Sequence, residues 1–136
     1  MSSTSVYDLG QQTDRTVLIV EDENVSRHAL QRLLSGCGFH AQAFGSAEEA
    51  LDDLRDRDHE SPQVALVDVD LPGMSGLDLA ARLEKSSPRT LTILITAASG
   101  ERIDNFCRAH PVAYLQKPVD FEHLLSMLQD SSAAGH

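Results

Sequence analysis

The chain has 136 residues, of which 11 are Lys or Arg and 21 are Asp or Glu, so its formal net charge is −10. This length predicts one domain that can bury a hydrophobic core without disulfides or a structural metal. Clustered Lys and Arg, which phosphate contacts require, do not occur, so we expect no direct binding of nucleic acid or of an anionic membrane. We also find no apolar run of bilayer-spanning length and no leader pattern, and expect neither export nor membrane insertion.

The chain divides into a central domain and two short ends. Residues 1–15 are polar and lack sustained periodicity, which predicts a flexible tail. Residues 16–130 are expected to form the folded domain, and 131–136 a C-terminal tail or the start of a linker. The two cysteines, Cys37 and Cys107, are far apart and form no CxxC motif. We therefore expect both to be buried apolar residues of a protein kept in a reducing compartment, the cytoplasm.

Short apolar segments alternate with amphipathic ones along the central domain. The apolar segments predict strands at 16–20, 39–44, 64–67, 91–95 and 112–115. The amphipathic segments predict helices that begin near 24, after 46, near 76, near 101 and after 120. This alternation predicts an α/β fold with right-handed crossovers, a flavodoxin-like doubly wound (βα)5 domain with a five-stranded parallel sheet in the order 2-1-3-4-5.

Local signals locate the ends and inner faces of several helices. Ser46 begins a capping box with Glu49, and Asp120 is placed to cap the last helix. In the first helix a set of residues spaced i, i+3, i+4 and i+7 predicts the face turned to the core: Leu30, Leu33, Leu34 and Cys37.

The stretch from residue 64 to residue 76 carries the strongest functional signal. An apolar run, Val64 to Val67, leads to Asp68 and then to a Pro- and Gly-containing loop at 71–76. Such a run is typical of a strand covered by helices on both faces. Because ligands of open parallel sheets bind at the carboxyl ends of the strands, Asp68 is well placed for chemistry.

Four of the expected strands deliver polar residues to the same edge of the sheet. In the 2-1-3-4-5 order the first and third strands are neighbours, so Asp22 and Asp68 should lie side by side. The complete set is Glu21 and Asp22 after the first strand, Asp68 after the third, Thr96 after the fourth and Lys117 after the fifth.

This set of side chains suits phosphoryl transfer. Converging carboxylates repel unless they are protonated, paired with a cation or bound to a metal, and hard oxygen ligands favour Mg²⁺. Lys117 supplies a fixed positive charge and Thr96 a hydroxyl donor. With Mg²⁺ they would stabilise the oxygens of a transferring phosphoryl group and leave Asp68 as an anionic nucleophile able to form an acyl phosphate.

At these residues the chain resembles the receiver domain of bacterial two-component response regulators, including the chemotaxis-regulator-like receivers, from about residue 16 to residue 129. Four motifs and one aromatic residue carry the resemblance: Glu21-Asp22, Asp68 with Leu71-Pro72 and Gly76, Thr96-Ala97, Lys117-Pro118, and Tyr114.

The resemblance implies a phosphorelay switch rather than an enzyme with its own substrate. Asp68 would take a phosphoryl group from a phosphohistidine of a sensor histidine kinase or phosphotransfer protein. Mg²⁺ would be held by Asp22, Asp68 and the backbone carbonyl of Asp70, with Glu21 in support. Thr96 would then move toward the phosphoryl oxygens and Tyr114 would turn inward.

That movement would change the surface formed by the fourth helix, fifth strand and fifth helix. Its target would be an output partner or a fused effector domain, and phosphorylation-dependent dimerisation is a further possibility that the resemblance raises. In this family phosphoryl lifetime varies with the residues at the positions of Asp70 and Ala98.

Two alternatives remain open at this point. A receiver-like interaction module would share the fold without being phosphorylated. A haloacid-dehalogenase-type phosphatase would also use the Asp68-Val69-Asp70 motif after an apolar strand, although Pro72 stands where that family has Thr or Val.

Overall fold

The computed structural model describes residues 15–56, 61–98 and 100–134, and its centre is one parallel sheet. The sheet has the strand order β2-β1-β3-β4-β5, which confirms the predicted flavodoxin-like topology. The strands are β1 (Thr16–Val20), β2 (His40–Phe44), β3 (Val64–Asp68), β4 (Leu91–Thr96) and β5 (Val112–Gln116).

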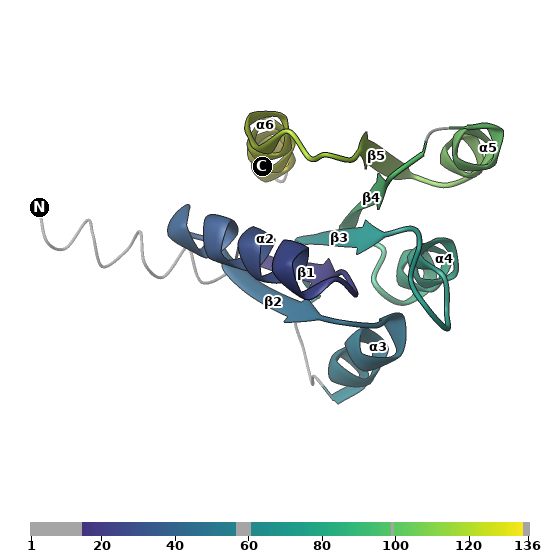
Figure 1. Cartoon of the computed structure of the whole chain (residues 1–136), viewed down its shortest axis with the longest axis horizontal. Helices are drawn as coiled ribbons and strands as arrows, with labels where there is room; N and C mark the ends of the chain where they lie inside the picture. Colours follow the sequence, from purple (N-terminus) through teal and green to yellow (C-terminus); the bar gives the residue numbers. More distant parts are fainter. Residues whose placement is uncertain (1–14, 57–60, 99, 135–136) are drawn as a thin grey trace, which may run out of the picture.

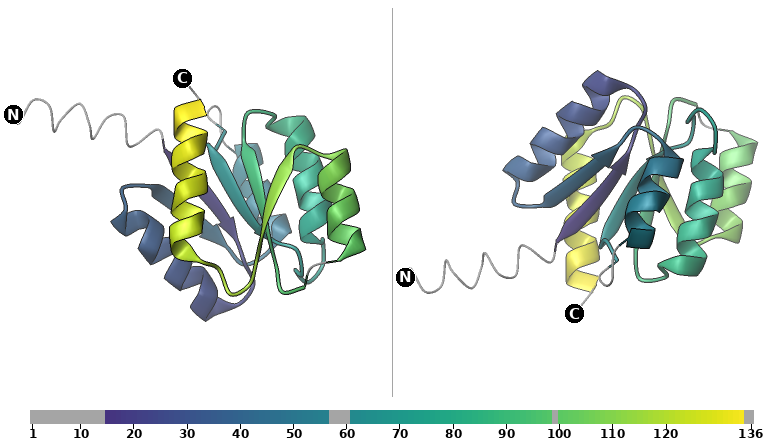
Figure 2. Two further views of the ribbon diagram at one scale, coloured as in Figure 1. Left: turned by 90° about the horizontal axis from the view of Figure 1, so that it is seen from above. Right: turned by 90° about the horizontal axis from the view of Figure 1, so that it is seen from below.

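Helices cover both faces of the sheet (Figure 1 and Figure 2). They are α2 (Asn24–Gly36), α3 (Ala47–Asp56), α4 (Gly76–Ser86), α5 (Glu101–Ala109) and α6 (Phe121–Ala134). The two buried apolar clusters show which helix lies where: one contains residues of α3, α4 and α5, and the other contains residues of α2 and α6. Each central strand is therefore buried on both of its faces.

The strand β1 shows why its sequence is an uninterrupted apolar run. Leu18 and Val20 belong to the cluster under α3, α4 and α5, while Val17 and Ile19 belong to the cluster under α2 and α6. Alternate residues of a strand point to opposite faces, so a strand covered on both sides needs apolar residues at every position.

Two of the predicted helix caps are confirmed. The Ser46 hydroxyl accepts a hydrogen bond from the Glu49 N–H at 3.1 Å, and the Asp120 carboxylate accepts one from the His123 N–H at 3.2 Å. The sequence reasoning missed a third cap, in which the Ser75 hydroxyl accepts from the Asp78 N–H at 3.1 Å. This cap fixes the start of α4 directly after the loop that follows Asp68.

The predicted inner face of α2 was partly wrong. Leu34 is fully buried, but Leu33 is 47% exposed and Cys37, at the end of the helix, is exposed as well. Leu33 is turned by about 100° around the helix axis from the buried Leu34, and its side of the helix faces solvent. Cys107 is half-buried, and burial, with the Asp104 charge added, raises the pKa of its thiol.

The structure describes only part of the two predicted ends of the chain. The expected N-terminal tail, apart from residue 15, lies outside the described residues. The helix α6 continues to Ala134, beyond the domain boundary expected at residue 130. Among the residues that the structure describes, no helix is both long enough and apolar enough to span a bilayer.

Candidate functional site at the carboxyl ends of the strands

Two neighbouring strands bring the acidic residues together. β1 and β3 pair in parallel with Val20 opposite Val67, so Glu21 directly follows β1 beside Asp68, the last residue of β3. Asp22 is the next residue of the chain. One carboxylate oxygen from each of Glu21, Asp22 and Asp68 lies within 4.8 Å of the others. The predicted convergence of these carboxylates is therefore seen in the structure.

The three consecutive acids at 21–23 have different surroundings. Glu21 is only 3% exposed, and its Oε2 accepts a hydrogen bond from the Glu23 N–H at 3.0 Å. Asp22 is exposed and turns toward the acidic cluster. The Glu23 carboxylate is the N-cap of α2, because it accepts the Ser26 N–H at 2.9 Å. Only Glu21 and Asp22 of the three therefore contribute oxygens to the site.

Lys117 supplies the positive charge of the site. Its backbone N–H donates to the Thr96 carbonyl at 2.8 Å, which extends the pairing of β5 with β4. Its Nζ lies 3.1 Å from Glu21 Oε1 and 3.1 Å from Asp68 Oδ2. The following Lys117–Pro118 peptide bond is cis.

Burial and charge change the pKa values of these groups. Burial raises the pKa of Glu21 above its usual range, and the Asp68 charge adds to the rise, while the Glu23 N–H and Lys117 oppose it. Burial also acts to lower the pKa of Lys117, but its hydrogen bonds to Asp68 and Glu21 outweigh that effect and raise it. Lys117 is therefore a cation at neutral pH, whereas ionised Glu21 is held at a cost in free energy.

The loop after Asp68 is held from two sides. Asp68 Oδ1 accepts the Asp70 N–H at 2.9 Å, so the Asp68 carboxylate is fixed by its own loop. Glu48, in the first turn of α3, accepts the Met74 N–H at 3.0 Å, and this contact lowers the pKa of Glu48. Gly73 has φ +72°, a left-handed conformation that suits a residue without a side chain. Sequence reasoning missed Glu48 because its partner is 26 residues away.

The two predicted switch residues, Thr96 and Tyr114, lie on β4 and β5. Thr96 is 2% exposed, and its hydroxyl donates to the Ala98 carbonyl at 2.7 Å rather than to the acidic cluster. A cavity of about 200 Å³ adjoins it, lined by Thr96, Asp70, Ala98 and the start of α5. Tyr114 of β5 lies opposite Leu94 and is 38% exposed.

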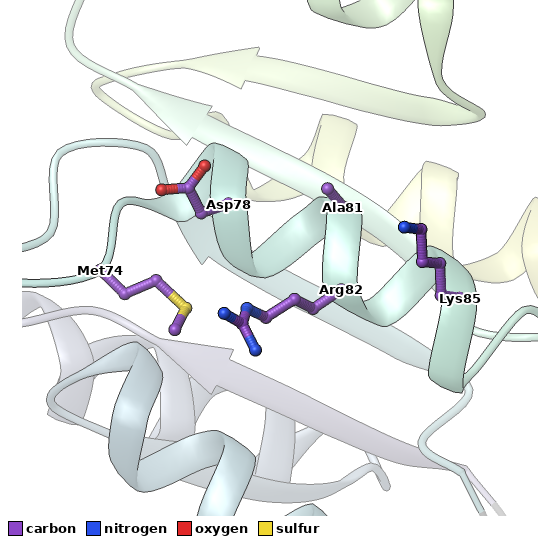
Figure 3. Close-up of a pocket in the computed structure, with 5 residues that line it drawn as sticks. All are labelled: Met74, Asp78, Ala81, Arg82 and Lys85. Atoms are coloured by element: carbon purple, nitrogen blue, oxygen red, sulfur yellow. The ribbon is translucent and has the colours of Figure 1, made fainter.

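A second hollow runs along α4 and includes none of the predicted site residues. It is lined by Met74, Asp78, Ala81, Arg82 and Lys85. Figure 3 shows the last four following one another along α4, with Met74 in the loop before the helix. The hollow along α4 and the acidic cluster therefore share no lining residue.

The residues at the carboxyl edge fit a hard divalent cation. The cluster has three carboxylates, two of which contact the single ammonium of Lys117, so it carries excess negative charge when its members are ionised. Like-charged carboxylates at this spacing are stabilised by a bound cation. Carboxylate oxygens open to water on the Asp22 side are ligands that suit Mg²⁺. The donor set of this structure is therefore compatible with the predicted metal.

Comparison with known proteins identifies the family. The model of the response regulator receiver domain matches residues 17–129, so the chain belongs to that family. The match agrees with the fold and leaves no support for the haloacid-dehalogenase alternative. Receivers are in general phosphoacceptor switches of two-component signalling rather than enzymes.

Two relatives illustrate the similarity in sequence. The two-component response regulator PhoP of Pseudomonas aeruginosa is 39% identical over 114 residues, which are 82% of this chain and 49% of PhoP. A cyclic di-GMP phosphodiesterase of Thermotoga maritima is 34% identical over 110 residues, 80% of this chain and 28% of that protein. The chain thus spans half or less of the length of these relatives.

Two solved structures illustrate the similarity in fold. The signal receiver domain of an HD domain-containing protein from Pseudomonas fluorescens has a TM-score of 0.79 at 27% identity, covering 88% of this chain and 94% of that one. The response regulator TrrA of Thermotoga maritima, solved in complex with Mg²⁺–BeF, has a TM-score of 0.74 at 27% identity, covering 86% and 98%.

Proposed function

We propose that this domain is a phosphoacceptor switch in which Asp68 takes a phosphoryl group from a phosphohistidine. The observation that carries the proposal is the position of the Asp68 carboxylate, which is 4% exposed, hydrogen-bonded to Lys117 at 3.1 Å and grouped with the oxygens of Glu21 and Asp22. One Asp68 oxygen forms a bond to phosphorus while the bond from phosphorus to the imidazole nitrogen breaks. The electron pair of that bond stays on the imidazole, and Asp68 becomes an acyl phosphate.

The chain's own residues prepare this transfer. The hydrogen bonds from Lys117 and from the Asp70 N–H orient the Asp68 carboxylate. The Lys117 ammonium also lies where negative charge increases on the transferring oxygens. Mg²⁺, held by Asp22, Asp68 and the Asp70 carbonyl with Glu21 in support, would neutralise part of that charge. The structure of TrrA with Mg²⁺–BeF supports the choice of this metal in a related receiver.

Switching would begin at Thr96. Its hydroxyl must exchange the Ala98 carbonyl for a phosphoryl oxygen, and the adjacent cavity of about 200 Å³ provides room for side chains to move. Tyr114, now 38% exposed, would turn inward and alter the surface of α5, β5 and α6. Moving such an equilibrium from 1:99 to 99:1 requires about 5.5 kcal/mol of differential stabilisation. Several charge-assisted hydrogen bonds to a phosphoryl group are of sufficient strength.

The upstream partner would be a sensor histidine kinase or a phosphotransfer protein. The output would pass to a separate protein or to a fused effector domain, as the greater length of the relatives suggests. The relative named a phosphodiesterase is matched over 28% of its length, so its activity is not carried over. Dimerisation on phosphorylation, the cytoplasmic location and the tail boundaries expected from the sequence remain parts of this proposal.

Intact-mass measurement after incubation with acetyl phosphate and Mg²⁺ tests the proposal. We expect the chain to gain one phosphoryl group, and Asp68→Asn or added EDTA to abolish the gain. Asp78→Asn is the matched control, because Asp78 is an exposed carboxylate on α4 outside the acidic cluster. If Asp68→Asn is folded and still labelled, Asp68 is not the acceptor and the proposal fails. If the wild-type chain is not labelled, the unphosphorylated interaction module becomes the better interpretation.

A further inference from the structure

One arginine outside the predicted site is bonded to the loop that carries its acidic residues. Arg27, in the first part of α2, donates from Nη1 to the Glu21 carbonyl at 2.9 Å and to the Asp22 carbonyl at 3.4 Å. Its Nη2 donates to Asn24 Oδ1 at 2.5 Å. One planar guanidinium group therefore spans two consecutive carbonyls and the helix start.

The Arg27 guanidinium packs against Gly45, where the absence of a side chain leaves room for it. A Cβ at residue 45 would lie 3.3 Å from Arg27 Nη1, tighter than most contacts of that kind. Glu21, whose carbonyl accepts from Arg27, also donates its own N–H to the Phe44 carbonyl at 3.0 Å. Glu21 is thus held through its N–H by the end of β2 and through its carbonyl by Arg27.

The contacts of Arg27 with the Glu21 and Asp22 carbonyls help to set the direction in which these two side chains point. Asp22 is exposed, and the position of its side chain depends on the backbone to which Arg27 is bonded. Groups that hold metal-binding residues in place commonly change metal affinity 10- to 100-fold when they are removed. Arg27 touches backbone atoms of Glu21 and Asp22 and acts only through them.

We propose that Arg27 is a positioning residue that holds the Glu21–Asp22 backbone in the geometry required to bind a divalent cation. The inference rests on the proposed function, since it concerns the same acidic site. It depends on the fork of the guanidinium, in which Nη1 donates to both carbonyls while Nη2 is fixed by Asn24 Oδ1. A lysine ammonium keeps the charge but cannot reproduce that fork.

Electrostatics and positioning predict opposite signs for the loss of Arg27. Removing a positive charge near three carboxylates favours a bound cation, so a purely electrostatic role predicts that Arg27→Gln binds Mg²⁺ more tightly. Loss of the backbone contacts predicts weaker binding. Arg27→Lys separates the two effects because it keeps the charge and loses the fork.

The test measures the Mg²⁺ affinity of each variant by titration with MgCl₂, followed by amide NMR shifts. Tryptophan fluorescence cannot be used because the chain has no tryptophan. We expect Arg27→Gln and Arg27→Lys each to weaken Mg²⁺ binding by about tenfold or more. Arg32→Gln is the matched control, since Arg32 is an exposed cation of the same helix, and we expect its affinity to equal or slightly exceed that of the wild type.

Amide hydrogen exchange without metal gives a second, independent measurement. The Glu21 and Glu23 N–H groups should exchange faster in both Arg27 variants than in Arg32→Gln, while the N–H groups in the centre of the sheet stay protected. If Arg27→Gln binds Mg²⁺ as tightly as the wild type, or Arg27→Lys restores full affinity, or loop exchange is unchanged, this inference is overturned. Failure of the wild type to bind Mg²⁺ would instead overturn the proposed function.

Discussion

The two edges of the sheet bury polar groups in different ways. At the amino edge, the Thr90 hydroxyl donates to the Pro62 carbonyl at 2.6 Å and pairs with the Ser87 hydroxyl at 2.6 Å. These groups are neutral and satisfy one another. At the carboxyl edge, Glu21 and Asp68 are 3% and 4% exposed and share the ammonium of Lys117.

This difference indicates that the polar groups of the amino edge serve stability and those of the carboxyl edge serve ligand binding. Neutral polar groups that satisfy one another join neighbouring segments and leave little for a ligand to bind. Buried like charges disfavour folding and retain the capacity to bind a cation or a developing charge. We therefore expect substitutions at the amino edge to lower stability alone, and those at the carboxyl edge to change stability together with Mg²⁺ binding.

The largest effect is expected from Gly76→Ala at the carboxyl edge. A Cβ there would lie 2.1 Å from the Asp68 carbonyl oxygen and 2.8 Å from the Val69 Cα, so the backbone behind Asp68 must move. We expect urea unfolding to show a loss of about 3 kcal/mol, the upper part of the range for overpacking, and acetyl phosphate labelling to fall.

Gly36→Ala is the matched control for that substitution. Nothing lies within 4 Å of a Cβ at residue 36, the last residue of α2. We expect it to be neutral or to stabilise by up to about 1 kcal/mol. Equal stability of the Gly76 and Gly36 variants would mean that the close approach at Asp68 is easily relieved.

Lys117→Met should have the next largest effect. It removes both hydrogen bonds of the ammonium and leaves Glu21 and Asp68 without their cation. We expect a loss of about 1.5–3 kcal/mol in EDTA, the range for hydrogen bonds to charged groups, and recovery of part of it with Mg²⁺. Lys85→Met, at an exposed position of α4, should stay within about 0.5 kcal/mol. If Mg²⁺ stabilises the Lys117→Met variant no more than it stabilises the wild type, the ammonium and the metal do not share one cation site.

Thr90→Val tests the amino edge. The substitution keeps the shape of the side chain but leaves the Pro62 carbonyl and Ser87 hydroxyl without their partner. We expect thermal or urea unfolding to show a loss on the order of 1 kcal/mol, with Mg²⁺ affinity unchanged. Thr90→Ser, which keeps the hydroxyl, should recover most of the loss. A change in Mg²⁺ affinity would break the proposed separation of the two edges.

The smallest effect is expected in the pH dependence of stability without metal. Because the folded state raises the pKa of Glu21, the folded chain binds more protons than the unfolded chain. The associated stability is present below the ordinary pKa of glutamic acid, about 4.3, and is lost as pH rises through the higher folded value. Glu21→Gln should remove this component of the profile measured in EDTA. An unchanged profile would show that Glu21 does not carry it.

Much of the fold and the main members of the site could be predicted from local patterns. The apolar run at 64–67 indicated a strand covered on both faces, and β3 is buried throughout. Parallel strands place their carboxyl ends at one edge, which is why Asp68 and Lys117 could be expected to meet across 49 residues of sequence. The family relationship agrees with these expectations for the domain as a whole.

The sequence by itself determined the order of strands and helices and the edge at which Asp22, Asp68 and Lys117 gather, because periodicity and strand polarity are local properties. Only the tertiary structure decided that Glu21 is buried and that Cys37 is exposed. It also decided the contacts that Arg27 and Glu48 make with the site loops. These outcomes depend on neighbours brought together by packing, and no spacing along the chain specifies which backbone atom will lie within reach of a long side chain.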